Sequence, residues 1–105
     1  MPARDWFNAL ATISGMNPWL ALPLDDYEGH MGLPHVNQLA PLADLCGEAL
    51  VRLRPRSVAV LGVAGGNGLE HVDGTLTTRV VGIDVNPGYL DATRQRFPDL
   101  RGLEL

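Results

Sequence analysis

The sequence contains no lysine and one cysteine, Cys46, and each scarcity excludes a class of site. A nucleotide-triphosphate loop needs a lysine beside its last glycine, so that kind of phosphate site is excluded. One cysteine can form neither an intrachain disulfide nor a thiolate metal cluster, which agrees with a reducing compartment. His30, His35 and His71 follow no metal-ligand spacing, so we expect no metal site.

Positive charge and long apolar runs are also scarce. Eight basic residues against twelve acidic ones give a formal net charge of −4, and the arginines form no cluster. Nucleic acid is therefore not an expected partner. The N-terminal apolar stretch is interrupted by Asn8, Thr12 and Ser14 and is too short to span a bilayer or to act as a good secretory signal. We expect a soluble cytoplasmic protein with no membrane partner.

Two short apolar runs are the clearest structural signals. Residues 57–61 read SVAVL and residues 79–83 read RVVGI, and both are rich in β-branched residues without strict alternation. This pattern is typical of strands buried on both faces of a parallel sheet. Helix-like segments precede the first run and follow both, as parallel crossovers require, and a third strand begins at Gly102. The sequence predicts an α/β fold.

The flanking segments predict several helices. One is expected from about Val36 to Leu53, with an apolar stripe that faces the core. Another is expected from Pro87 to about Phe97, with Asn86 as its cap. Residues 17–34 show no steady period and predict a loop with one or two helical turns, and Asp5 can cap a short helix before them.

Residues 62–68, which read GVAGGNG, follow the first predicted strand. Ligands of parallel α/β sheets bind beyond the carboxyl ends of the strands, where this loop falls. Gly65, Gly66 and Gly68 lack a Cβ, so the backbone can take positive φ and a ligand can approach the peptide groups. Residues 69–72 would then open a helix whose free N–H groups face the ligand.

Asp84 ends the second predicted strand and is placed to accept both hydroxyls of a ribose. A plainer alternative stays open, in which the glycines make only a tight turn and Asp84 only caps the next helix. The dinucleotide pattern G-x-G-x-x-G requires a glycine at His71 when read from Gly66, or at Asn67 when read from Gly62. An NAD-binding domain is therefore the weaker nucleoside-site alternative.

These motifs resemble those of the class I S-adenosylmethionine-dependent methyltransferases. The family's three glycine-type positions, spaced by two, match Ala64, Gly66 and Gly68, while its preceding acidic position falls on Gly62. The strand that ends in Asp84 is similar to the next motif. The resemblance implies that Asp84 binds the ribose of S-adenosylmethionine and that Val85 and Asn86 flank the adenine. It implies a cofactor site made of Gly62, Ala64, Gly65, Gly66, Gly68, Asp84, Val85 and Asn86.

The resemblance also implies a Rossmann-like, doubly wound parallel sheet of about seven strands, preceded by N-terminal helices. The chain would hold the first two to three strands, so we expect residues 36–105 to be the first half of a truncated methyltransferase domain. Residues 1–35 would form an N-terminal extension. In it, residues 19–31 resemble the segment that closes over the active site in this family, although for Tyr27 and His30 an ordinary surface loop with polar contacts is the favoured interpretation.

The expected function is S-adenosylmethionine-dependent methyl transfer to a small-molecule acceptor, because no basic patch is present. The catalytic residues are not identified, but Glu70 is a hypothetical partner of the cofactor's ammonium group in place of the acid missing at Gly62. The alternative is a non-catalytic assembly module. In the family the first strand is central, so without the second half it would expose an unpaired apolar edge and favour a homo-oligomer.

Overall fold

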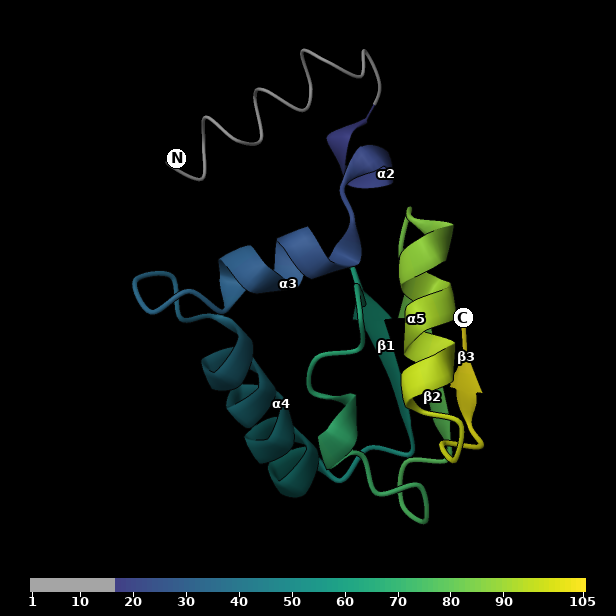
Figure 1. Cartoon of the computed structure of the whole chain (residues 1–105). Coiled ribbons are helices and arrows are strands. Elements are labelled where there is room, and N and C mark those ends of the chain that lie inside the picture. Colours follow the sequence, from purple (N-terminus) through teal and green to yellow (C-terminus); the bar gives the residue numbers. More distant parts are fainter. Residues whose placement is uncertain (1–16) are drawn as a thin grey trace.

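The computed structural model describes residues 17–105, and the helix expected near Asp5 lies outside them. Figure 1 shows the described elements in space. In chain order they are α2 (Pro18–Ala21), α3 (Leu24–Met31), α4 (Leu39–Leu53), β1 (Ser57–Leu61), η1 (Leu69–His71), β2 (Arg79–Ile83), α5 (Pro87–Arg96) and β3 (Leu103–Glu104).

The three strands form one parallel sheet in the order β1-β2-β3. Strand β1 pairs with β2 along its full length, from Ser57 opposite Arg79 to Leu61 opposite Ile83. Strand β3 joins the other edge of β2, with Leu103 opposite Val80. Both apolar runs are therefore strands, and the third strand lies where it was predicted. The chain has an α/β fold with a parallel sheet.

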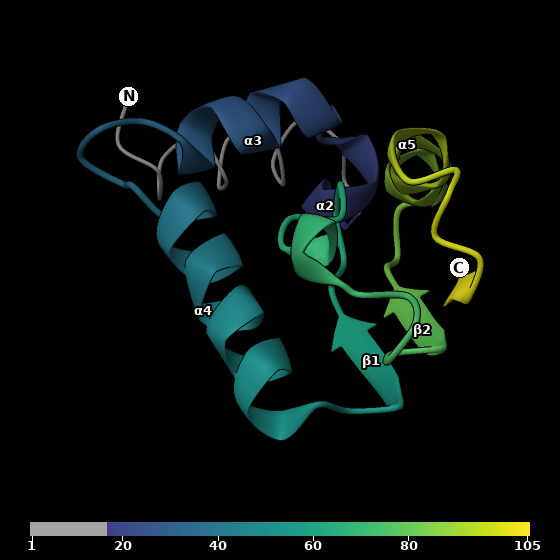
Figure 2. The same ribbon diagram turned by 90° about the horizontal axis from the view of Figure 1, so that it is seen from below.

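Helix α5 and the turn η1 lie over one face of the sheet, while α4 lies beyond the edge strand β1 and packs against η1 (Figures 1 and 2). On that side Val80 is fully buried and packs with Val63 and Leu69. On the other side Leu61 is 80% exposed and Ile83 is 48% exposed. The prediction that both runs are buried on both faces is therefore wrong for residues 17–105. The described helices cover only one face, so alternate side chains of each strand point to solvent.

Helix α4 begins at Leu39, three residues later than expected, and ends at Leu53 as predicted. Its residue Ala43 is buried, and the Cys46 thiol lies 3.8 Å from the Gly68 carbonyl oxygen, so the helix packs against the glycine-rich loop. Its predicted apolar stripe is only partly buried, however, because Leu53 is 67% exposed.

The segment after the loop differs most from the prediction. Instead of a helix, residues 69–71 form a single turn of 3-10 helix, η1. The chain then turns at Asp73, whose carboxylate accepts hydrogen bonds from the Thr75 backbone N–H at 2.9 Å and from its hydroxyl at 2.6 Å. This side-chain turn offers the backbone an alternative to helical bonding, so the helix does not continue.

Two helices begin with an asparagine cap followed by proline, and of these the cap at Asn86 was predicted. The Asn86 side chain accepts a hydrogen bond from the Gly88 N–H at 2.9 Å, and Pro87 is the first residue of α5. Asn17 caps α2 in the same way, through the Trp19 N–H at 3.0 Å. Residues 17–34 are thus more helical than predicted. Within residues 17–105, no helix combines the length and apolar character needed to cross a membrane.

Candidate functional site

Asp84 connects the end of β2 to the glycine-rich loop. Its Oδ2 accepts a hydrogen bond from the Ala64 backbone N–H at 2.9 Å, and its Oδ1 accepts one from the Asn86 N–H at 3.0 Å. A carboxylate can accept about four hydrogen bonds, so about two acceptor positions stay available. The predicted proximity of Asp84 and the loop is confirmed.

Ala64 adopts a left-handed conformation, with φ of +49°. Such a backbone is unfavourable for a residue that carries a Cβ. The bond from its N–H to Asp84 holds the loop in this conformation at the end of the sheet. The loop and the acid therefore form one unit, in which each fixes the position of the other.

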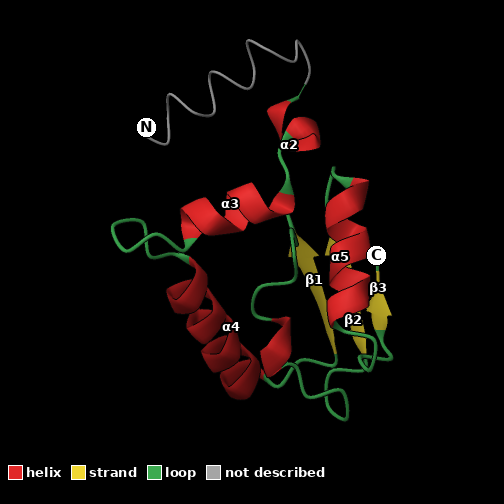
Figure 3. Ribbon diagram, in the orientation of Figure 1, coloured by secondary structure: helices red, strands yellow, loops and turns green. Residues whose placement is uncertain are grey.

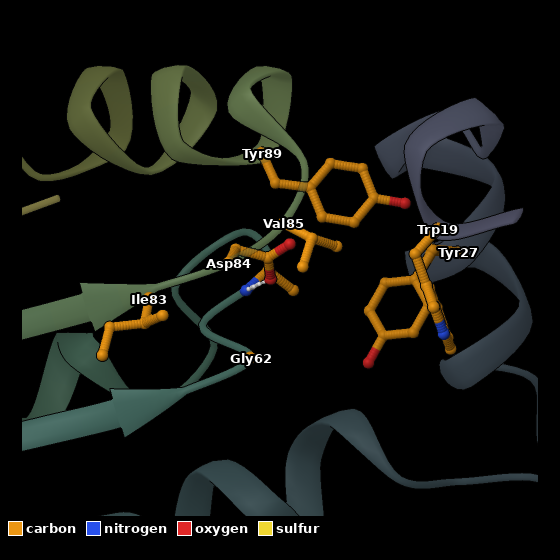
Figure 4. A pocket seen from close by; sticks show the side chains of 8 residues that line it. Trp19, Tyr27, Gly62, Ile83, Asp84, Val85 and Tyr89 are labelled. Atoms are coloured by element: carbon orange, nitrogen blue, oxygen red, sulfur yellow. Dashed lines mark hydrogen bonds between the residues drawn. The ribbon is translucent and has the colours of Figure 1, made fainter. Parts of the chain in front are cut away.

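A cleft of about 340 Å³ opens beside this unit (Figure 4). One wall is formed by the loop and the end of β2, and the other is formed by aromatic side chains of the N-terminal segment and α5. The first wall consists of Gly62, Ala64, Ile83, Asp84 and Val85. The second consists of Trp19, Tyr27 and Tyr89.

The aromatic wall is a connected group of rings. The Trp19 and Tyr27 rings meet edge to face with centroids 5.7 Å apart, and Tyr27 stacks on Tyr89 at 6.3 Å. Figure 4 shows the Tyr27 hydroxyl pointing into the cleft, whereas the Tyr89 hydroxyl points away from it. The Tyr89 hydroxyl donates to the Leu22 carbonyl at 2.7 Å, and no hydrogen bond within the described part of the chain engages the Tyr27 hydroxyl.

The N-terminal segment is held against α5 by polar contacts. The Asn86 amide donates to the Trp19 carbonyl at 2.9 Å, near the Tyr89 bond to Leu22. Further along α5, Arg96 donates to both carboxylate oxygens of Glu28, at 2.7 and 2.8 Å. Arg96 therefore ties α3 to α5. Residues 18–31 therefore contribute a fixed wall to the cleft.

The cleft has an acidic and aromatic character. Among the residues of 17–105 that line the cleft, Asp84 carries the only charged side chain. Burial raises the pKa of the Tyr27 hydroxyl, and the negative charges of Asp84 and Glu28 raise it further. Burial and the same two carboxylates, together with Asp26 and Tyr27, raise the pKa of Tyr89 to about 12. At neutral pH both phenols stay protonated, so Tyr27 is a neutral hydrogen-bond donor and not a general base.

The glycines have a different role from the one predicted. Gly66 and Gly68 do have positive φ, at +86° and +98°. A Cβ at Gly66, however, would lie 2.6 Å from the Phe97 ring, and one at Gly68 would lie 3.0 Å from Cys46. A Cβ at Gly65 would collide with the Arg96 guanidinium. These three glycines allow side chains of α4 and of the C-terminal end of α5 to pack closely against the loop, and none of the three lines the cleft.

The loop N–H groups are largely used within the loop. The Gly66 N–H donates to the Val63 carbonyl, the Leu69 N–H to the Gly66 carbonyl, and the Gly68 N–H to Glu70 Oε2 at 2.9 Å. The expected helix start with free N–H groups facing a ligand is therefore not formed. Glu70 is engaged with the loop backbone and does not line the cleft, so the geometry does not support its hypothetical contact with a cofactor.

Of the eight predicted site residues, the structure brings four to the cleft: Gly62, Ala64, Asp84 and Val85. Asn86 lies directly behind it as a helix cap and as a contact of Trp19. His30 does not line it. Sequence reasoning missed Tyr89; its signal was an aromatic residue in the first turn of a helix that starts at the end of β2.

No group of three or more histidine, cysteine or acidic residues in the described part of the chain is arranged to hold a metal ion. No protein-family model, curated protein or solved structure matches the chain. The function must therefore be inferred from the geometry and chemistry of the cleft.

Proposed function

We propose that the cleft binds the adenosyl part of S-adenosylmethionine, and that the chain is the cofactor-binding half of a Rossmann-like methyltransferase with a small-molecule acceptor. The observation that carries this proposal is the Asp84 carboxylate at the carboxyl end of β2. Two backbone N–H groups fix its orientation, and its remaining acceptor positions suit the two hydroxyls of a ribose. Cytoplasmic location remains part of the same proposal.

The surroundings of Asp84 suit a nucleoside. Ile83 and Val85 flank the acid and are partly exposed on the cleft wall, so their apolar side chains offer a surface for adenine. Gly62, which has φ of +71° and open space where a Cβ would point, allows the sugar to approach the backbone. A base and a sugar of this size would occupy much of a 340 Å³ cleft.

The charges favour a nucleoside without phosphates. A dinucleotide needs N–H groups or basic side chains for its pyrophosphate. Here no basic side chain of residues 17–105 lines the cleft, and the Ala64, Gly66 and Gly68 N–H groups are already bonded within the protein. These features count against an NAD-binding domain.

S-adenosylmethionine would supply an electrophilic methyl group when bound. The residues of this chain would align the cofactor and exclude water from it, as in-line transfer requires. Asp84 would orient the ribose, while Trp19 and Tyr27 would close the side of the cleft that faces the N-terminal segment. The acceptor would enter beside these rings.

Calorimetric titration with S-adenosylhomocysteine tests the proposal. Asp84→Asn should lower the affinity for S-adenosylhomocysteine tenfold or more, because it weakens the charge-assisted hydrogen bonds from two ribose hydroxyls to one carboxylate. Asp91→Asn is the matched control, because Asp91 is an exposed acid of α5 that pairs with Arg94. NAD should not bind. A folded wild-type protein that binds neither compound, or equal affinities of both variants, would contradict the nucleoside site.

The uncovered sheet favours a second candidate function, assembly of copies of this chain. Within residues 17–105, β1 pairs only with β2 and leaves its other edge open, and Leu61 beside that edge is 80% exposed. An open apolar edge favours pairing with another chain. Light scattering should then give a dimer that Leu61→Arg converts to a monomer, with Val51→Arg on the exposed side of α4 as control. A wild-type monomer at high concentration would refute this candidate.

A further inference from the structure

Asn67 and Gly68 form the one asparagine–glycine pair in the sequence, and they lie in the glycine-rich loop between β1 and η1, beside α4 (Figure 3). Asparagine is chemically labile, because the backbone nitrogen of the next residue can attack its side-chain carbonyl carbon. A glycine in that place leaves the nitrogen unhindered, since it has no Cβ. Asn67 is exposed, so water reaches its side chain. The pair therefore has the chemistry of a deamidation site.

The other four asparagines of the sequence are less suited to this reaction. Asn17 and Asn86 precede prolines, which have no backbone N–H to ionise. Asn8 and Asn37 precede alanine and glutamine, whose side chains hinder the attack. The same chain thus holds slower sites with which Asn67 can be compared.

Two hydrogen bonds restrain the reaction in the folded chain. The Asn67 side-chain amide donates to the Leu39 carbonyl at 2.8 Å, which holds the amide against the first residue of α4. The Gly68 N–H donates to Glu70 Oε2 at 2.9 Å. The attacking species is the Gly68 nitrogen without its proton. A carboxylate that accepts a hydrogen bond from this N–H stabilises the protonated form, and its negative charge disfavours the anionic nitrogen.

We propose that Asn67 is a site of spontaneous deamidation whose rate is controlled by the Glu70 carboxylate. The Gly68 nitrogen gives its proton to hydroxide and forms a bond to Asn67 Cγ. The bond from Cγ to the amide nitrogen breaks, and this nitrogen takes a proton from water and leaves as ammonia. Water then opens the cyclic imide at either carbonyl, which gives aspartate or isoaspartate. The reaction consumes only water and is independent of the nucleoside site.

Deamidation changes the contact between the glycine-rich loop and α4. A carboxylate has no N–H to donate, so the bond to the Leu39 carbonyl is lost and the new negative charge faces a carbonyl oxygen. The weaker contact of the Cys46 thiol with the Gly68 carbonyl oxygen, at 3.8 Å, remains. Conversion of Asn67 therefore loosens the loop from α4.

Peptide mapping by mass spectrometry after incubation of the folded chain tests the site. Asn67 should gain the mass of an amide-to-acid change faster than Asn8 and Asn37. Glu70→Ala should accelerate the change at Asn67 about tenfold, as expected for loss of one charge-assisted hydrogen bond. Glu104→Ala is the matched control, because it removes an exposed carboxylate of β3 that pairs with Arg79, and it should leave the rate unchanged.

The same measurement can overturn the inference. Absence of conversion at Asn67 in the folded chain would exclude the site, and equal rates in the wild-type protein and Glu70→Ala would exclude control by the carboxylate. Should Glu70→Ala fail to fold, Glu70→Gln keeps a neutral acceptor for the Gly68 N–H and should accelerate the change about fivefold.

Hydrogen exchange tests the consequence for the loop. Asn67→Asp reproduces one product of the reaction, and in it the protection factors of the Gly68 and Leu69 amides should fall about fivefold, as expected for loss of one hydrogen bond. The amides of β2 should keep their protection. Asn37→Asp adds the same charge in the turn before α4 and is the matched control. Unchanged protection of Gly68 and Leu69 in Asn67→Asp would refute the loosening of the loop.

Discussion

The bond from Tyr89 to the Leu22 carbonyl gives the sharpest test of how the N-terminal segment is fixed. Tyr89 is 3% exposed and Leu22 is 2% exposed, so the 2.7 Å bond lies away from water. Tyr89→Phe removes the donor but keeps the ring, and it leaves the Leu22 carbonyl buried without this partner. Loss of a hydrogen bond that leaves a buried group unsatisfied costs about 1–3 kcal/mol.

The free energy of unfolding should therefore fall by about 2 kcal/mol in Tyr89→Phe. For a chain of this length, that loss lowers the melting temperature by roughly 8–16 °C. Tyr27→Phe is the matched control. It removes a hydroxyl that has no hydrogen bond within the described residues, so its unfolding free energy should change by less than about 0.5 kcal/mol.

Urea unfolding followed by circular dichroism measures both variants, and limited proteolysis reports whether residues 18–31 detach. In Tyr89→Phe, cleavage in this segment should accelerate before global unfolding begins. Equal stability losses in the two variants would refute the reasoning, because they would mean that the bond to Leu22 does not distinguish the two phenols.

Three other predictions follow from the same contacts. Gly66→Ala should destabilise the fold by about 2–4 kcal/mol, because the new Cβ would meet Phe97 in a backbone with φ of +86°. Gly62→Ala, at φ of +71° with open space around the new Cβ, should cost only about 1 kcal/mol. Thermal unfolding compares the two variants. The pKa of Tyr89 is raised to about 12, against 10.0 for the free group, so ionisation of this hydroxyl favours the unfolded chain. The free energy of unfolding should therefore be constant below pH 10 and fall by about 2 kcal/mol as pH rises from 10 to 12. Tyr89→Phe should flatten that slope. Arg96→Gln, which loses the ion pair to α3, should accelerate proteolysis of residues 18–31 while β1 and β2 stay protected from hydrogen exchange; uniform loss of protection would contradict a local role.

The pairing of Asp84 with the loop shows what could be predicted of the site. An acid at the end of the second strand and a turn at the end of the first must meet, because parallel neighbouring strands end at the same edge of a sheet. That inference needed only the order of strands, and the bond from Ala64 to Asp84 confirms it. The roles of Gly65, Gly66 and Gly68 could not be predicted in the same way, because they depend on side chains of α4 and α5 that pack against them.

The sequence by itself determined the local elements. Apolar β-branched runs specified the strands, and the Asn-Pro pairs at 17–18 and 86–87 specified two helix starts through side-chain capping. Only the tertiary structure decided that Trp19 and Tyr27 meet Tyr89 in one cleft, and that the described helices leave one face of the sheet exposed. Periodicity and capping act over a few residues, whereas these features depend on contacts between segments about 60–70 positions apart, which no local pattern encodes.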